Sequence, residues 1–428
     1  MTTNNTRLFK KSLLAVTITL ASSQAMAAGF QLNAQSATGL GRAFAGDAVI
    51  ADNASVMARN PAAMSMFDKT ELSLGFETIT TDIKVSDATY TSAMNPISTP
   101  TSSNYDDAGG TSVAPNIHLI VPVNEKFAWG VNAYSNFGTS TDFGSDFAAS
   151  EFGGETDIMS LNFGLAGSYR LNDQWSFGAG LDIIYGKGTL KRTTSSNLSA
   201  DPSSPFNGLS LVDIDGADGW GVGFNVGTVY ELDENNRFGL SYRYSPEITA
   251  EDSKGQEIKL PLPDMAEFSG YHRIEDTKFA VHYSVQWIGW SAFDSIDFEK
   301  LDPTQSTLAY ALSGGTGAYQ KDYKWQDGWH YAIGGTYYLN TDWTLRAGYM
   351  YDTSAQDSLT SISVPDSDRQ WFSAGFTYHI NTDSNVDFGF TYLLGDDTKV
   401  EESLGATSVS ATTHADAILL GLQYSRSF

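Results

Sequence analysis

Residues 159–170, MSLNFGLAGSYR, alternate between two kinds of side chain with a period of two. The odd positions hold Met159, Leu161, Phe163, Leu165, Gly167 and Tyr169, and the even positions hold Ser160, Asn162, Gly164, Ala166, Ser168 and Arg170. Because successive side chains of a β-strand point to opposite faces, this pattern predicts a strand with one apolar and one polar face. The pattern recurs at 220–230 and 238–244, so strands are expected from about Thr70 onward.

The connections between the predicted strands come in two alternating sizes. Short polar turns are expected near 124–125, 172–173, 233–236, 289–292, 340–342 and 381–385, and long polar stretches at about 86–111, 138–157, 187–218, 245–276, 298–327, 353–367 and 395–414. Six short turns and seven long loops imply fourteen strands. Short turns at one rim, long loops at the other and an even strand number are typical of outer-membrane barrels.

Two further features distinguish a membrane barrel from a soluble β-sandwich, which also alternates. Aromatic side chains lie near the ends of the apolar faces, where rings would meet the two membrane interfaces; they include Phe127, Trp129, Trp175, Trp343 and Tyr351. The chain also ends on a strand whose apolar face includes the terminal Phe428, as the last seam of a closed barrel would. The predicted fold is therefore all-β, a fourteen-stranded antiparallel transmembrane β-barrel.

The first 27 residues have the pattern of a secretory signal peptide. Arg7, Lys10 and Lys11 precede a short apolar run, and small residues lead to Ala27. The apolar run is far shorter than the roughly 20 residues that a membrane helix needs. Cleavage before Ala28 and residence in the outer membrane of a Gram-negative bacterium are therefore expected.

Composition narrows the possible partners. With 50 Asp and Glu against 25 Lys and Arg, the formal net charge is -25, which disfavours nucleic acid as a partner because phosphate binding needs a basic surface. The chain has no Cys, so an exported protein of this size must be held together without disulfides. A closed barrel meets that requirement by pairing its backbone groups internally.

Residues 28–69 precede the predicted barrel, which spans 70–428. Within them, GLGRAFAGDAVIADNASVMARNPAAMSMF (39–67) is rich in Ala and Gly and does not alternate. A fourteen-stranded wall encloses more space than its side chains fill, and small residues would let this backbone pack against the inner wall. We therefore predict a small N-terminal hatch in the lumen, in which Asn60 caps a helical turn that starts with Pro61.

Several longer stretches carry more specific information than the alternation. They are AGFQLN (28–33), GLGRAFAGDA (39–48), ARNPA (58–62), SNFGTSTDF (135–143), GWGVGFNVGTVYELDENNRFGLSYR (219–243), WSAF (290–293) and VPDSDRQWFSAGFTY (364–378). Together they resemble the FadL family of long-chain fatty acid outer-membrane transporters. The resemblance implies that a hatch plugs the barrel, that ligand is captured near the extracellular loops, and that it leaves through a lateral opening. By analogy, the strand at 127–137 would border that opening.

The resemblance also implies candidate residues for substrate binding. Phe30 is expected near the bound ligand. In the basic stretch YGKGTLKR (185–192), Arg192 continues the inward parity of its strand and is the first candidate for binding a carboxylate. Lys187 falls on the outward parity and ranks lower. A second base is expected from Lys321 or Lys324.

Gating is assigned to the hatch residues Asn60, Pro61 and Ala62, and to Asp366 and Arg369 where a long loop re-enters the wall. For Asp366 and Arg369, a structural ion pair is the alternative interpretation and is slightly favoured.

The expected function is passive uptake of long-chain fatty acids or similar hydrophobic ligands. No catalytic site, metal site or cofactor is expected, because no Ser and His pair stands out and the acidic clusters fit solvated loops. The alternatives are uptake of other hydrophobic compounds such as aromatic hydrocarbons, and a surface receptor or adhesin barrel. A monomer is expected, in contact with outer-membrane lipids, lipopolysaccharide and the barrel-assembly machinery.

Overall fold

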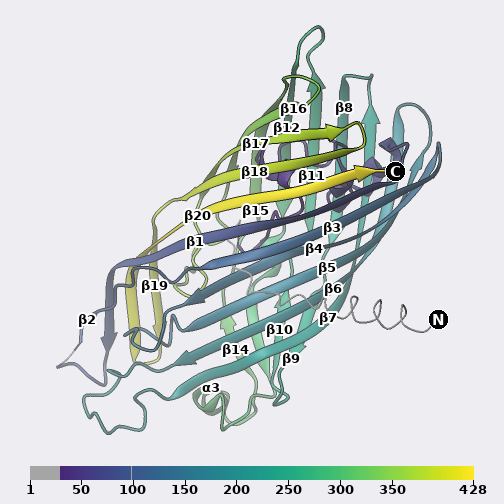
Figure 1. The fold of residues 1–428 in the computed structure, drawn as a ribbon. Helices are drawn as coiled ribbons and strands as arrows, with labels where there is room; N and C mark the ends of the chain where they lie inside the picture. Colours follow the sequence, from purple (N-terminus) through teal and green to yellow (C-terminus); the bar gives the residue numbers. More distant parts are fainter. Residues whose placement is uncertain (1–28, 98) are drawn as a thin grey trace, which may run out of the picture.

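A computed structural model describes residues 29–97 and 99–428, and the predicted signal peptide lies outside them. In this part of the chain, fourteen antiparallel strands form a closed barrel (Figure 1). In order around the wall they are β1 (Glu71–Ser92), β3 (Thr111–Asn124), β4 (Phe127–Asp142), β5 (Glu155–Arg170), β6 (Trp175–Thr193), β7 (Ser210–Glu231), β8 (Asn236–Tyr244), β11 (Met265–Arg273), β12 (Phe279–Ile288), β15 (Gly328–Tyr338), β16 (Trp343–Asp352), β17 (Arg369–Asn381), β18 (Ser384–Gly395) and β20 (Thr407–Ser427). Pairing of β20 with both β18 and β1 closes the ring.

Shorter elements lie in the long connections or before the wall. In the long connections are β2 (Thr101–Ser102), β9 (Glu247–Glu251), β10 (Glu257–Pro261), η3 (Trp290–Ala292), β13 (Ser295–Glu299), α3 (Thr307–Leu312), β14 (Tyr319–Asp322) and β19 (Thr398–Leu404). Before the wall are α2 (Ala37–Leu40) and the 3₁₀ turns η1 (Ala54–Ala58) and η2 (Pro61–Met66). None of the helices among the described residues is long and apolar enough to cross a membrane. Figure 1 places β2, β9 and α3 at the end of the barrel opposite the C-terminus.

The alternation predicted from 159–170 is confirmed in β5. Leu165 is 56% exposed on the outer face, whereas Asn162 is fully buried on the lumenal face. The same division holds in β7, where Trp220 and Val222 are exposed and Asn225 is buried. The wall is therefore apolar outside and polar inside, as a barrel in lipid requires.

One predicted turn was wrong, although the strand number was right. Residues 289–292 are not a short turn but the start of the long connection from β12 to β15, and the strand expected after them, β13, pairs with β10 and β14 outside the wall ring. The missing wall strand is β11, which lay inside the long loop expected at 245–276. The two errors cancel in the count.

The composition of β11 explains why it was missed. Its lumenal face is polar, with Glu267 and Ser269 buried, and its outer face has a gap at Gly270. The Tyr283 ring on the neighbouring strand β12 covers that glycine so closely that a Cβ would overlap it. The apolar outer surface is thus completed by a cross-strand neighbour that local sequence does not reveal.

Candidate functional site

The N-terminal segment, residues 29–69, packs against the lumenal side chains of the wall and is buried over most of its length. Its backbone comes very close to wall glycines: a Cβ added at Gly41 would lie 3.0 Å from the Cα of Gly375, and one added at Gly178 would overlap the backbone at Ala62. The small residues of this segment therefore allow close packing against the inner wall, as predicted.

Asn60 caps η2 as predicted. Its side-chain oxygen accepts a hydrogen bond from the backbone N–H of Ala62, and Pro61 occupies the start of the turn. The amide of Asn60 also donates to the backbone oxygens of Ala48 (2.9 Å) and of Thr228 on β7 (3.0 Å). One side chain thus joins two parts of the segment to the wall.

Buried ion pairs provide further links between the segment and the wall. Arg59 lies 3.6 Å from Asp47 within the segment and 3.4 Å from Glu267 on β11. Arg346 on β16 lies 3.2 Å from Asp52. Such pairs hold geometry more than they add stability, because both charges lose hydration when buried.

The wall contains a break in pairing between β3 and β4. The two strands pair from Asn124 and Phe127 as far as Asn116 and Tyr134, and from Ser135 onward β4 has no β3 partner among the described residues. The β4–β5 register also shifts between Ser135 and Phe137.

The N-terminal segment occupies the free edge of β4. Gln31 forms an antiparallel bridge with Phe137. The N–H of Leu32 donates to the Asn136 oxygen (2.9 Å), and the N–H of Gly138 donates to the Phe30 oxygen (2.8 Å). The segment therefore supplies the hydrogen bonds that β3 does not.

Phe30 is buried in a cluster of aromatic rings. Its ring centroid lies 4.6 Å from Trp290, 5.3 Å from Phe293, 5.8 Å from Trp325 and 6.2 Å from Phe137. Trp290 and Phe293 belong to the WSAF stretch, whose role local sequence did not indicate. We call these five residues the Phe30 cluster.

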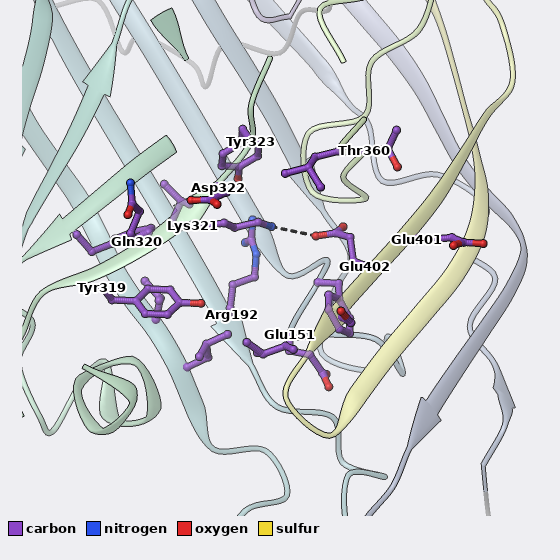
Figure 2. Close-up of a pocket in the computed structure, with 18 residues that line it drawn as sticks. Glu151, Arg192, Tyr319, Gln320, Lys321, Asp322, Tyr323, Thr360, Glu401 and Glu402 are labelled. Carbon is purple, nitrogen blue, oxygen red and sulfur yellow. Dashed lines mark hydrogen bonds and ion pairs between the residues drawn. The ribbon is translucent and has the colours of Figure 1, made fainter. Parts of the chain in front are cut away.

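A cavity of about 380 Å³ lies among the long connections, and Figure 2 shows its lining. Side chains from β6, β14 and β19 line it, including Arg192, Lys321 and Glu402, together with Tyr323, which directly follows β14. Tyr323 connects the cavity to the Phe30 cluster, because its ring lies 5.0 Å from Phe293 and 6.1 Å from Trp325. We call this space the loop cavity.

Arg192 points inward as its parity predicted. Its guanidinium is buried and donates to the backbone oxygens of Glu155 (2.5 Å) and Lys191 (2.8 Å) and to the Thr156 hydroxyl (2.6 Å). All three acceptors are neutral, and the ion pairs of the described residues do not include Arg192. The Glu402 and Glu155 carboxylates act on Arg192 only from a longer range. A buried cation beside a cavity that forms no close ion pair is a suitable partner for an anionic group.

The structure separates the three lysine candidates. Lys321 lies in the loop cavity, with its Nζ 3.2 Å from the Glu402 carboxylate and 5.2 Å from the centroid of the Tyr323 ring. Burial lowers the pKa of Lys321, but the Glu402 carboxylate and the Tyr323 hydroxyl together outweigh burial, so the pKa is raised and the ammonium stays charged. Lys187 is exposed on the outside of β6, and Lys324 is exposed near Asp322 (3.5 Å), so neither joins Arg192.

Asp366 and Arg369 form a buried ion pair of 2.6 Å at the end of the loop before β17. Arg369 also lies 3.3 Å from Asp352, and Asp366 accepts a hydrogen bond from the Ala355 N–H (2.6 Å). The pair therefore joins both ends of the loop between β16 and β17, which fits the structural interpretation.

Comparison with known proteins places the chain in a family. Residues 18–428 match the family described as "Outer membrane protein transport protein (OMPP1/FadL/TodX)". The chain belongs to this FadL family. Its barrel is accordingly an outer-membrane barrel of the kind found in Gram-negative bacteria, and the FadL family consists of transport proteins rather than enzymes.

Individual members of the FadL family match this chain over nearly its whole length. The chain is 38% identical to the long-chain fatty acid transport protein of Escherichia coli O6:H1, over 98% of this chain and 99% of the relative. It is 33% identical to outer membrane protein P1 of Haemophilus influenzae, again over 98% and 99%.

Solved structures support the FadL-family fold. A FadL homologue of Pseudomonas aeruginosa superposes with a TM-score of 0.79 at 21% identity, over 94% of this chain and all of that one. The toluene transporter TodX of P. putida superposes with a TM-score of 0.63 at 18% identity, over 88% of this chain and 94% of that one.

Proposed function

We propose that this chain is a passive channel that takes up long-chain fatty acids across the outer membrane. The observation that carries the proposal is Arg192, a buried guanidinium whose hydrogen-bond partners are all neutral, in a cavity whose lining residue Tyr323 contacts the Phe30 cluster. A cation followed by an apolar path suits a ligand with a carboxylate at one end and a hydrocarbon tail. Relatives named long-chain fatty acid transport proteins support this choice of ligand.

The tail contributes most of the affinity and the head group orients the ligand. Burying about fifteen methylenes at roughly 0.8 kcal/mol each offers on the order of 12 kcal/mol before ordering costs. One ion pair to the buried Arg192 adds a net gain of only about 1 kcal/mol, because the carboxylate loses its hydration on entering. Arg192 and Lys321 therefore set the orientation in which the acid enters, whereas the tail determines most of its affinity.

Lateral release proceeds at the break between β3 and β4. The tail moves from the loop cavity into the Phe30 cluster, where it replaces the contacts of Phe30. Residues 30–32 then leave the edge of β4, and the gap that they covered opens toward lipid. An apolar chain gains nothing from a polar lumen, so a sideways exit is the favourable one.

In this proposal residues 28–69 act as a hatch that gates the route. Asn60, Pro61 and Ala62 form its hinge, because their contacts to β6 and β7 hold the segment while residues 30–32 move. Asp366 and Arg369 contribute indirectly by keeping the loop between β16 and β17 in place. The protein works as a monomer embedded in outer-membrane lipids and lipopolysaccharide, and the barrel-assembly machinery inserts it.

Replacing Arg192 with Ala tests the ligand assignment. Arg192→Ala is expected to weaken oleate binding about tenfold or less, equivalent to about 1.4 kcal/mol or less, and to leave binding of methyl oleate nearly unchanged. Lys187→Ala is the matched control, because it removes a cation from the outer face of the same strand. An equal loss for acid and ester would exclude carboxylate recognition by Arg192, and would favour neutral compounds such as aromatic hydrocarbons.

A further inference from the structure

The loop cavity already contains a carboxylate of the protein itself. Glu402 on β19 places Oε2 3.2 Å from the Nζ of Lys321, and its Oε1 accepts a hydrogen bond from the Ile362 N–H (2.7 Å). The Glu402 side chain is 11% exposed and that of Lys321 28% exposed, so water screens this pair only partly. Figure 2 shows the head groups of Arg192 and Lys321 beside one another, with the Glu402 carboxylate across from the Lys321 ammonium.

The two cations of the cavity therefore differ in their partners. Arg192 donates to neutral oxygens only, whereas Lys321 is paired with an acid. The buried hydroxyl of Tyr323, beside Lys321, has no partner within the described chain. An entering carboxylate would therefore find the Arg192 guanidinium and the Tyr323 hydroxyl available, and the Lys321 ammonium occupied by Glu402.

We propose that Glu402 is a specificity-determining residue, an internal counter-ion that an entering carboxylate displaces from Lys321. The inference rests on the proposed function, because it assumes an acid that Arg192 receives. The exchange needs only one of the Glu402 oxygens to move, since the other is held by the Ile362 N–H.

A competing carboxylate serves a passive channel in a definite way. Two unpaired cations in a partly buried cavity would hold an acid head group more tightly than one, and a channel without an energy source must release what it binds. An entering acid must first separate Glu402 from Lys321, so its binding is weakened by the free energy of that ion pair. A neutral ligand leaves this pair intact, so its binding does not depend on Glu402.

The test compares Glu402→Gln with the wild type in the purified full-length protein, using oleate and methyl oleate as probes. Loss of the competitor should tighten oleate binding about three- to tenfold, slow oleate dissociation, and leave methyl oleate binding unchanged. Glu401→Gln is the matched control: it removes the same charge from the same hairpin, and Figure 2 shows Glu401 pointing away from Lys321. Unchanged or weaker oleate binding in Glu402→Gln would overturn the proposal.

A double-mutant cycle distinguishes an effect of Glu402 on Lys321 from an effect on the folding of β19. In a Lys321→Gln background, Glu402→Gln should change oleate binding less than it does in the wild type, because the pair is already absent and only the longer-range attraction of Glu402 for Arg192 remains. An effect of undiminished size would show that Glu402 does not act through Lys321 and would overturn the inference. Failure of the proposed function would give a different result, because Arg192→Ala would then leave oleate binding unchanged. If Arg192→Ala weakens oleate binding but Glu402→Gln does not change it, only the role of Glu402 is rejected.

Discussion

A disulfide between residues 31 and 137 should close the proposed lateral exit. Gln31 and Phe137 face each other in an antiparallel bridge flanked by the two hydrogen bonds on either side. Such a pair has a Cα separation of about 4.5 Å, which lies within the range that a disulfide spans. The chain has no Cys of its own, so Gln31→Cys combined with Phe137→Cys creates a single possible bond.

The structure sets the free energy that the exit needs without the staple. Freeing residues 30–32 breaks two main-chain hydrogen bonds, at about 0.5 to 1.5 kcal/mol each, and exposes Phe30, at about 1.5 to 3 kcal/mol. The total of about 2.5 to 6 kcal/mol corresponds to an open fraction of about 10⁻² to 10⁻⁴. A ligand tail offsets this cost by filling the Phe30 cluster, but it cannot break a disulfide.

The assay is uptake of labelled oleate by cells with equal surface levels of the double variant, before and after reduction. The oxidised form should lose most of the uptake that the reduced form shows, because the disulfide keeps residues 30–32 on β4, while purified oxidised protein still binds oleate at the loop cavity. The reduced form controls for loss of the Phe137 ring. Equal uptake in the two redox states would refute movement of residues 30–32 as the gate.

Two further changes probe the hatch. Phe30→Glu should abolish most oleate uptake while the barrel stays folded, because an unpaired carboxylate among buried aromatic rings expels residues 29–32 from the cluster; wild-type uptake at equal surface level would contradict this. Asn60→Ala removes the cap of η2 and two bonds to backbone oxygens, so it should loosen the segment by about 1 to 2 kcal/mol. Protease cleavage near residue 60 should rise while the melting temperature of the barrel barely changes, and an unaltered cleavage rate would argue against a hinge there.

The barrel wall could be predicted from sequence because its signal is local. In a strand, neighbouring side chains point to opposite faces, and in this wall those faces meet lipid and a polar lumen, so 159–170 alone identified the pattern. The inward position of Arg192 followed from the same parity. The cap at Asn60 was predictable for a similar reason, because it depends on residues two apart. Where the outer face was completed by a neighbouring strand, at Gly270 of β11, the local pattern failed.

The assembly of the site was decided by tertiary structure. Phe30 meets Phe137 and Trp290, and Lys321 meets Glu402, which is 81 residues away in sequence. No periodicity relates such residues, because their proximity depends on closure of the barrel and on how its long connections fold over the lumen. The same dependence separated Lys321, which faces the cavity, from Lys324, three residues further along and exposed. Pleating orients a side chain within its own strand, but only the closed wall determines which distant residue it faces.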